Sequence, residues 1–224
     1  MSFARPLTSR AHSIVLAGAL ILVTLITPLV SSAHFMGWPN GHWPWAAYHH
    51  LLTINYSRGC TGSFYTAAGD AASGWTATWT PLYFSEVGSP PCTGTAYNGY
   101  VDLYSYSNAG DWAWGWAQAY ALHTVCDFWF FGCWSSHQVL DPSWNEPYAS
   151  GVIMLNTAKA TGSNYFLLVG DVTHEMGHTL GLAHSGYYNG EATGYYSIMD
   201  YLNWSYNRPQ THDVNDVNFL YPGW

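Results

Sequence analysis

The stretch His174-Glu175-Met176-Gly177-His178-Thr179-Leu180-Gly181-Leu182-Ala183-His184 decides how this chain of 224 residues is interpreted. Its pattern is H-E-x-x-H-x-x-G-x-x-H. Two histidines four residues apart lie on one face of a helix, where both imidazoles can bind a single metal ion. The glycine tolerates the left-handed backbone of a sharp helix exit, which brings the last histidine back toward the other two. The pattern therefore predicts a metal site on a helix and the turn that follows it.

The residue types in this pattern indicate what the site does. Three imidazoles leave one position of a zinc ion open, which is the arrangement of catalytic rather than structural zinc. Glu175 is adjacent to the first ligand and is placed as a general base that takes the proton of a zinc-activated water. A helix with incidental histidines is the alternative, but five fixed residues make a chance match improbable, on the order of one in ten million per position. We predict that His174, His178 and His184 are the metal ligands and that Glu175 is catalytic.

A second element follows the third histidine, in the residues Ser197-Ile198-Met199-Asp200-Tyr201. An extended zinc motif followed by such a methionine turn resembles the metzincin clan of zinc peptidases. The resemblance implies that Met199 lies beneath the three imidazoles as an apolar floor, although methionine is also ordinary core material. It further implies an α+β fold in which a mixed, twisted sheet carries an active-site helix and a C-terminal helix.

The sequence around the motif is similar to one family of this clan, the matrixins of bacterial and archaeal type. Residues Gly151–Thr157 resemble the strand ahead of the active-site helix, Ser185 follows the third histidine, and residues Asp213–Tyr221 resemble the C-terminal helix. One position differs, because Tyr201 stands where matrixins usually have proline and where astacins and serralysins have tyrosine. That likeness implies a catalytic hydroxyl near the metal or the oxyanion. Packing beneath the site is the alternative for Tyr201.

Other metal ions are possible on the same resemblance, since matrixins often bind a structural zinc and calcium in the long loop before the strand at Val152. The usual ligand spacing is absent here, so the sequence predicts one catalytic Zn2+ and assigns no site to Ca2+ or to a second Zn2+. The metal-binding residue types in that region are His123, His137, Asp111, Asp127, Asp141 and Glu146.

The N-terminus has the pattern of a secretory signal peptide. Two arginines precede an apolar run from Ile14 to Val30, and small residues ending at Ala33 supply a cleavage site. An uncleaved membrane anchor is the alternative, because the run is long enough to be considered. We predict cleavage after Ala33, a secreted protein, and one catalytic domain over residues 34–224.

Charge excludes one class of partner. Only Arg58, Lys159 and Arg208 carry a positive charge after residue 33, whereas all 13 Asp and Glu residues follow it. Without a cationic surface the protein has nothing to neutralise phosphates, so we expect no nucleic-acid partner. No later apolar stretch is long enough to span a membrane. We expect a monomer that acts on a protein or peptide substrate.

Four cysteines, Cys60, Cys92, Cys126 and Cys133, follow the signal sequence. An even number behind a signal peptide favours two disulfides. Cys60–Cys92 with Cys126–Cys133 is the preferred pairing, and the nested and crossed pairings stay open. Because no close Cys-x-x-Cys pair is present, a cysteine-based zinc site is not expected.

Periodicity indicates further elements. The helix of the zinc motif is expected from about Tyr165 to Gly181, with Ser163 or Asn164 as its cap. Asp171 is expected to be a solvated acid of its first turns, and support of the metal ligands from one turn before His174 is the alternative. Its core-facing stripe is Val172, Met176, Thr179 and Leu180. Strands are expected at residues 51–56, 81–87, 100–106 and 112–116, and a helix at residues 64–78.

The strand at residues 112–116 alternates tryptophan with small residues. A sheet face packed on a core or loop is the favoured interpretation, and a sugar-binding platform is the alternative.

Together these features predict a secreted zinc endopeptidase whose substrate lies along an edge strand, with Val152–Thr157 as the expected one. Two alternatives stay open. One is a zinc-containing binding module without proteolytic activity, directed at carbohydrate through its tryptophans. The other is a hydrolase of cell-wall peptides. The intact Glu175 favours an enzyme, because a binding module needs no general base.

Overall fold

The computed structural model describes most of the chain after residue 51. Side chains are described except at residues 122–142, 160, 187–188 and 191–192. Contacts within the chain separate residues 1–33 from residues His34–Trp224, and every described residue belongs to the second unit. The predicted signal peptide lies outside the described residues, so its cleavage stays a prediction. The described residues are Trp43 and the ranges 52–88, 99–111, 113–129, 132–142, 148–160, 164–185, 187–188, 191–192, 196–200 and 205–222.

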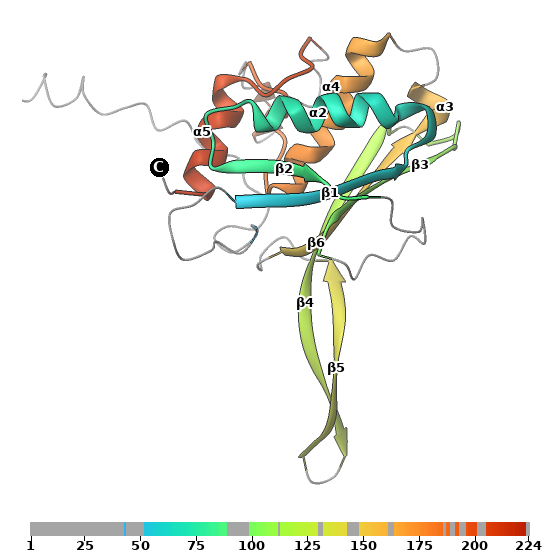
Figure 1. Ribbon diagram of the computed structural model, residues 1–224, viewed down its shortest axis with the longest axis vertical. Helices are drawn as coiled ribbons and strands as arrows, with labels where there is room; N and C mark the ends of the chain where they lie inside the picture. The colour runs from blue at the N-terminus through green and yellow to red at the C-terminus, as the bar shows by residue number, and fades with distance from the viewer. Residues whose placement is uncertain are drawn as a thin grey trace, which may run out of the picture. The chain divides into compact units, whose positions relative to one another are not determined.

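Six strands form one mixed sheet (Figure 1). The first four strands across the sheet run parallel, whereas the fifth is antiparallel to the fourth and the sixth is antiparallel to the fifth. Parallel neighbours need a crossover connection, and helix α2 (Tyr65–Thr76) supplies the one between β1 and β2. The order across the sheet is β2 (Leu82–Glu86), β1 (Leu52–Cys60), β3 (Val101–Tyr106), β6 (Tyr148–Asn156), β4 (Gly115–Trp129) and β5 (Gly132–Pro142).

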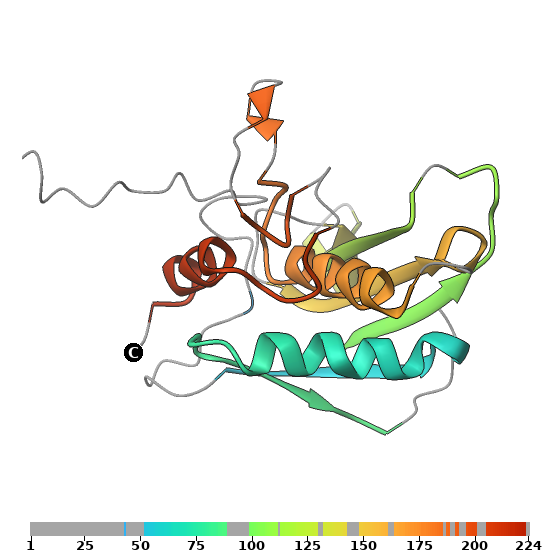
Figure 2. The ribbon, with the colours of Figure 1, turned by 90° about the horizontal axis from the view of Figure 1, so that it is seen from above.

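Two long helices cover one face of this sheet. Helix α2 packs on β1 and β2, helix α4 (Tyr165–Thr179) packs on β4 and β6, and the two helices lie side by side (Figure 2). Four fully buried alanines of α2 permit this close approach. The shorter described elements are η1 (Gly62–Phe64), α3 (Thr157–Ala160), the hairpin of β7 (Tyr187–Tyr188) and β8 (Glu191–Ala192), and the C-terminal helix α5 (Thr211–Leu220).

The predicted α+β class, with a mixed sheet, a helix that carries the zinc motif and a C-terminal helix, is confirmed. The helix predicted at residues 64–78 and the strands predicted at residues 51–56, 81–87 and 100–106 are present within a few residues of those bounds. The predicted core-facing stripe of α4 is buried throughout. Its cap is Asn164, whose side chain accepts a hydrogen bond from the Leu167 N–H at 2.9 Å.

The strand predicted at residues 112–116 is wrong in its extent. Strand β4 begins only at Gly115, where β6 supplies a partner, and it continues to Trp129 because β5 pairs with it from Tyr120 onward. The region expected to be a long loop is therefore a β-hairpin, in which two strands satisfy each other's backbone groups (Figure 1).

The residues suggested for a second metal in this region are not tested by the structure. Asp111 binds the Tyr106 hydroxyl at 2.8 Å and the Ala113 N–H at 3.1 Å. The side chains of His123, Asp127, His137 and Asp141, together with Glu146, lie outside the described residues.

The prediction that substrate pairs along Val152–Thr157 is wrong. Strand β6 is an interior strand, with β3 on one side and β4 on the other, so both rows of its backbone hydrogen-bonding groups are used. A candidate edge lies one strand further across the sheet, in the first part of β4. Among the described strands, residues Gly115–Ala119 of β4 pair with β6 alone, because β5 joins β4 only at Tyr120.

The tryptophans of this strand do not form the packed face that was expected. Gly115 faces helix α4, and side chains alternate along a strand, so Trp116 points to the opposite face. Trp116 is 41% exposed and Trp114 is half-buried, since the described helices that pack on the sheet lie on the other face. Trp112 lies outside the described residues.

Cys60 is disulfide-bonded, and the described part of the chain contains no free cysteine. Cys92 and the side chains of Cys126 and Cys133 lie outside the description, so the pairing itself stays a prediction. None of the helices in the described ranges has the length and apolar character that crossing a membrane requires.

Candidate metal centre

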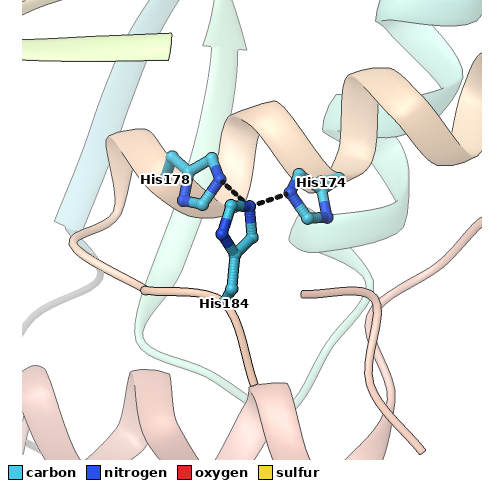
Figure 3. A group of neighbouring side chains, drawn as sticks. All are labelled: His174, His178 and His184. Carbon is cyan, nitrogen blue, oxygen red and sulfur yellow. Dashed lines mark hydrogen bonds between the residues drawn. The ribbon is translucent and has the colours of Figure 1, made fainter. Parts of the chain in front are cut away.

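Helix α4 and the turn after it bring three histidines together. The helix ends at Thr179, two residues earlier than predicted, because Gly181 takes the left-handed conformation with φ at 93°. The Leu182 N–H then donates to the Gly177 carbonyl at 3.1 Å, which closes the turn. This reversal carries His184 back across the face of α4 on which His174 and His178 lie (Figure 3).

The three imidazoles converge on one point (Figure 3). The His184 Nε2 lies 3.1 Å from the His174 Nε2 and 3.1 Å from the His178 Nε2. The three ligand atoms all lie within 4.8 Å of one another, and no second group of this kind is found among the described residues. The sequence motif thus places its three histidines in one cluster that can hold a single metal ion.

The hydrogen bonds of the rings test whether the cluster fits a cation. His174 Nδ1 lies 2.8 Å from the Ile198 carbonyl, and His178 Nδ1 lies 2.8 Å from the Leu182 carbonyl. A carbonyl oxygen only accepts, so both Nδ1 atoms carry the proton and both Nε2 atoms present a lone pair. These lone pairs face His184, whose Nε2 has at most one proton to donate. A shared cation satisfies all three nitrogens, whereas protons alone do not.

Burial keeps these rings neutral. Desolvation, together with the neighbouring His184, lowers the pKa of His174 to about 4. Desolvation also lowers the pKa of His178, and the neighbouring His174 and His184 lower it further. The pKa of His184 is lowered by desolvation as well. Neutral imidazole is the form that binds a metal, so the ligands are ready at neutral pH without losing protons.

Met199 lies under the helix that carries two of the histidines. It is buried, and a Cβ built on Gly177 would overlap the Met199 Sδ and lie 3.2 Å from Trp75 Cζ2. The Ser185 N–H donates to the Met199 carbonyl at 3.0 Å. This bond connects the methionine turn to the segment that carries His184. Gly177 is therefore the position that lets the sulfur approach α4 between His174 and His178.

Substituting Gly177 by alanine should disturb this contact. Because the added methyl has no space, we expect a loss of about 1–3 kcal/mol in the free energy of unfolding, together with faster loss of bound metal. Thermal unfolding and metal release to a chelator measure the two effects. Gly74→Ala is the matched control, since its Cβ would meet only ordinary contacts at 3.7 Å in helix α2 and alanine favours helix. Equal stabilities for the two variants would contradict this role of Gly177.

The loop that carries Met199 is anchored by helix α5. The buried Asp213 carboxylate accepts from the Ser197 hydroxyl, from the Ile198 N–H at 2.9 Å and from the Gln210 N–H at 2.7 Å. The carbonyl of Ile198 in turn receives the His174 Nδ1–H. Asp213 is thus linked to the His174 ring through a single residue, Ile198. Sequence analysis did not single out this residue, although an acid three residues into a helix is a capping signal.

Glu175 lies beside the first residue of strand β4. It is buried, and a Cβ built on Gly115 would lie 3.1 Å from the Glu175 Cγ and 3.3 Å from its Oε1. Its Oε2 is buried without a hydrogen-bond partner in the described ranges. Burial and the nearby Asp171 raise the pKa of Glu175 above its ordinary value. A carboxylate of raised pKa is a stronger base than an exposed glutamate.

The expectation that Asp171 is solvated is wrong. Asp171 is only 3% exposed, and burial raises its pKa. Asp171 precedes Glu175 by one helical turn, and its charge contributes to the raised pKa of Glu175. Both carboxyl groups are therefore on the buried side of α4. The neighbouring Gly170 is covered as well, since a Cβ there would lie 2.5 Å from the Tyr206 carbonyl oxygen.

Tyr201, the predicted catalytic tyrosine, lies outside the described residues, so its hydroxyl stays a prediction.

No protein-family model matches this chain, and no curated protein matches it. Among solved structures it is similar to high choriolytic enzyme 1, a hatching enzyme zinc-protease from the medaka fish Oryzias latipes. The two sequences are 13% identical, the match covers 85% of this chain and 98% of that chain, and the TM-score is 0.47. A likeness of this size does not define a family or an activity.

Proposed function

We propose that this protein is a secreted zinc-dependent endopeptidase of metzincin type. The observation that carries the proposal is the convergence of three Nε2 atoms at the helix that also carries the buried Glu175. An open fourth position beside three imidazoles is typical of catalytic zinc. Secretion is supported by the signal-peptide pattern that ends at Ala33.

The ligands in this proposal are His174, His178 and His184, with Met199 beneath them. A zinc ion held there supplies Lewis acidity and an acidified water. The carboxylate of Glu175 accepts a proton from that water and passes it to the leaving amine of the peptide. Burial of Glu175 excludes bulk water from the carboxylate and keeps its basicity high.

The substrate in this proposal lies along Gly115–Ala119 of β4. Among the described strands these residues pair with β6 alone, and a Cβ built on Gly115 would lie 3.1 Å from the Glu175 Cγ, so an extended peptide paired there passes beside the general base. Adding a strand to a sheet edge is a common way to bind an extended peptide independently of its sequence.

A methyl group at Gly115 should therefore impair catalysis. It would lie 3.1 Å from both the Glu175 Cγ and the Met154 carbonyl oxygen, so the glutamate has to move. We expect Gly115→Ala to lower kcat by about tenfold to 10²-fold while metal content stays the same, because small misplacement of a catalytic group is costly. Gly151→Ala on β6 is the control, since its Cβ would meet Val101 at 3.4 Å and does not approach Glu175. Unchanged kcat in Gly115→Ala would separate this position from the general base.

Tyr201→Phe tests the predicted hydroxyl. The change keeps the ring and removes only a donor that can stabilise charge in the transition state. A catalytic hydroxyl predicts a loss of about tenfold or more in kcat, with KM and zinc content little changed. Full activity would leave Tyr201 as a packing residue.

The proposal as a whole is tested by loading the purified protein with one equivalent of zinc and measuring casein cleavage before and after chelation. Metal-dependent cleavage supports an endopeptidase. Zinc binding with hydrolysis of peptidoglycan peptides, and not of casein, would replace it by a cell-wall hydrolase. Zinc binding without hydrolysis of either would leave a binding module.

A further inference from the structure

Trp43 reaches the end of the metal-binding helix from a distant part of the sequence. Its side chain is 7% exposed. The indole Nε1–H donates to the Thr179 carbonyl at 2.9 Å. The Trp43 backbone N–H donates to the hydroxyl of Tyr221 at 3.1 Å, and that hydroxyl donates to the Leu180 carbonyl at 3.0 Å.

These two carbonyls are ones that the chain cannot satisfy locally. The last carbonyls of a helix have no partner within it. The turn after α4 uses the carbonyls of Gly177 and His178, which receive the N–H groups of Leu182 and Gly181. Thr179 and Leu180 come next and are fully buried, so their carbonyls depend on Trp43 and Tyr221.

The hydrogen bonds to the Thr179 and Leu180 carbonyls lie next to the metal centre in sequence. Thr179 and Leu180 stand between His178, the second histidine of the cluster, and Gly181, where the chain reverses toward His184. Fixing the Thr179 peptide fixes the direction in which the reversal begins. Trp43 is itself held against the sheet, because its ring meets the ring of the fully buried Tyr148 edge-on, with centroids 6.3 Å apart.

We propose that Trp43 is a positioning residue for the third metal ligand. Its indole N–H fixes the end of α4 and thereby holds His184 over His174 and His178. This inference rests on the proposed zinc site. A purely structural tryptophan would contribute to folding stability without a specific effect on metal retention, so the two roles differ in a measurable way.

Trp75 provides the matched control. It is also fully buried, and its indole Nε1–H also donates to a carbonyl of α4, that of Thr173 at 3.0 Å. Thr173 lies inside the helix, where the helical ladder already supplies a partner for the carbonyl. Trp75→Phe removes the same kind of bond from the same helix and leaves the hydrogen bonds of the turn that leads to His184 in place.

The experiment compares wild type, Trp43→Phe and Trp75→Phe, each with and without His184→Ala. Zinc-loaded proteins are mixed with a chromogenic chelator and the rate of zinc release is measured, with the melting temperature recorded in parallel. Partners outside the ligand set typically change metal affinity by about 10–100-fold. We expect Trp43→Phe to release zinc about tenfold faster than wild type and Trp75→Phe to stay within about twofold. With His184 replaced, Trp43→Phe should add nothing.

Each outcome decides. Equal release from Trp43→Phe and Trp75→Phe, or an undiminished effect of Trp43→Phe when His184 is absent, overturns the positioning role. Wild type that binds no zinc overturns the proposed function as well, so the two failures are distinguishable. If Trp43→Phe does not fold, Tyr221→Phe replaces it, because it removes the hydroxyl that links the Trp43 N–H to Leu180. Wild-type release from that variant counts against the inference.

Discussion

The Glu175→Ala variant should keep one zinc ion per chain and lose peptide hydrolysis by about 10²–10⁴-fold, the usual contribution of a general base. Metal binding survives because the three nitrogen atoms that converge all belong to histidines. Hydrolysis fails because the described structure places no other carboxylate in the position beside Gly115.

Metal analysis together with casein cleavage checks both halves of this expectation. Glu86→Ala is the control, since Glu86 binds Arg58 and Tyr65 at the surface, away from the cluster. Wild-type turnover in Glu175→Ala would rule out the general-base mechanism. Loss of zinc in the same variant would instead make Glu175 part of the metal site.

Replacing His184 by alanine should reduce zinc affinity and activity together. His184 supplies the nitrogen that lies 3.1 Å from each of the other two, so without it the metal has two protein ligands in place of three. Catalytic zinc typically has three protein ligands, so two imidazoles are expected to bind it more weakly.

Dialysis against a weak chelator, followed by metal analysis, measures this effect. The control is His212→Ala, a buried histidine of α5 whose Nε2 lies 3.4 Å from Asp216 and outside the cluster. It should lose stability and retain zinc. Unchanged zinc retention in His184→Ala would remove His184 from the ligand set.

The parts of the site that could be predicted from sequence are those fixed by local spacing. His174 and His178 are neighbours because a helix has 3.6 residues per turn, and the reversal at Gly181 follows from glycine's freedom at positive φ. The buried stripe of α4 and its Asn164 cap follow from equally local rules.

The parts that could not be predicted depend on which distant segments meet. Strand β6 is an interior strand because β4 pairs with it, and the alternation of residues within β6 does not reveal this pairing. From the sequence, Asp171 is expected to be solvated because an acid in the first turns of a helix is commonly exposed, and the local sequence does not show how far the buried side of α4 extends. Trp43 binds Thr179 from 136 positions away, and Asp213 binds Ile198 from 15 positions away.

The bond between Trp43 and Tyr221 closes a loop of unusual length, since 178 positions separate the two residues. Contacts of such separation carry a large entropic cost of loop closure and form late in folding. A chain that is still being synthesised has the helix with His174 and His178 but not yet Tyr221. We infer that the third ligand of the proposed metal site is fixed only after Tyr221 has been synthesised and has met Trp43.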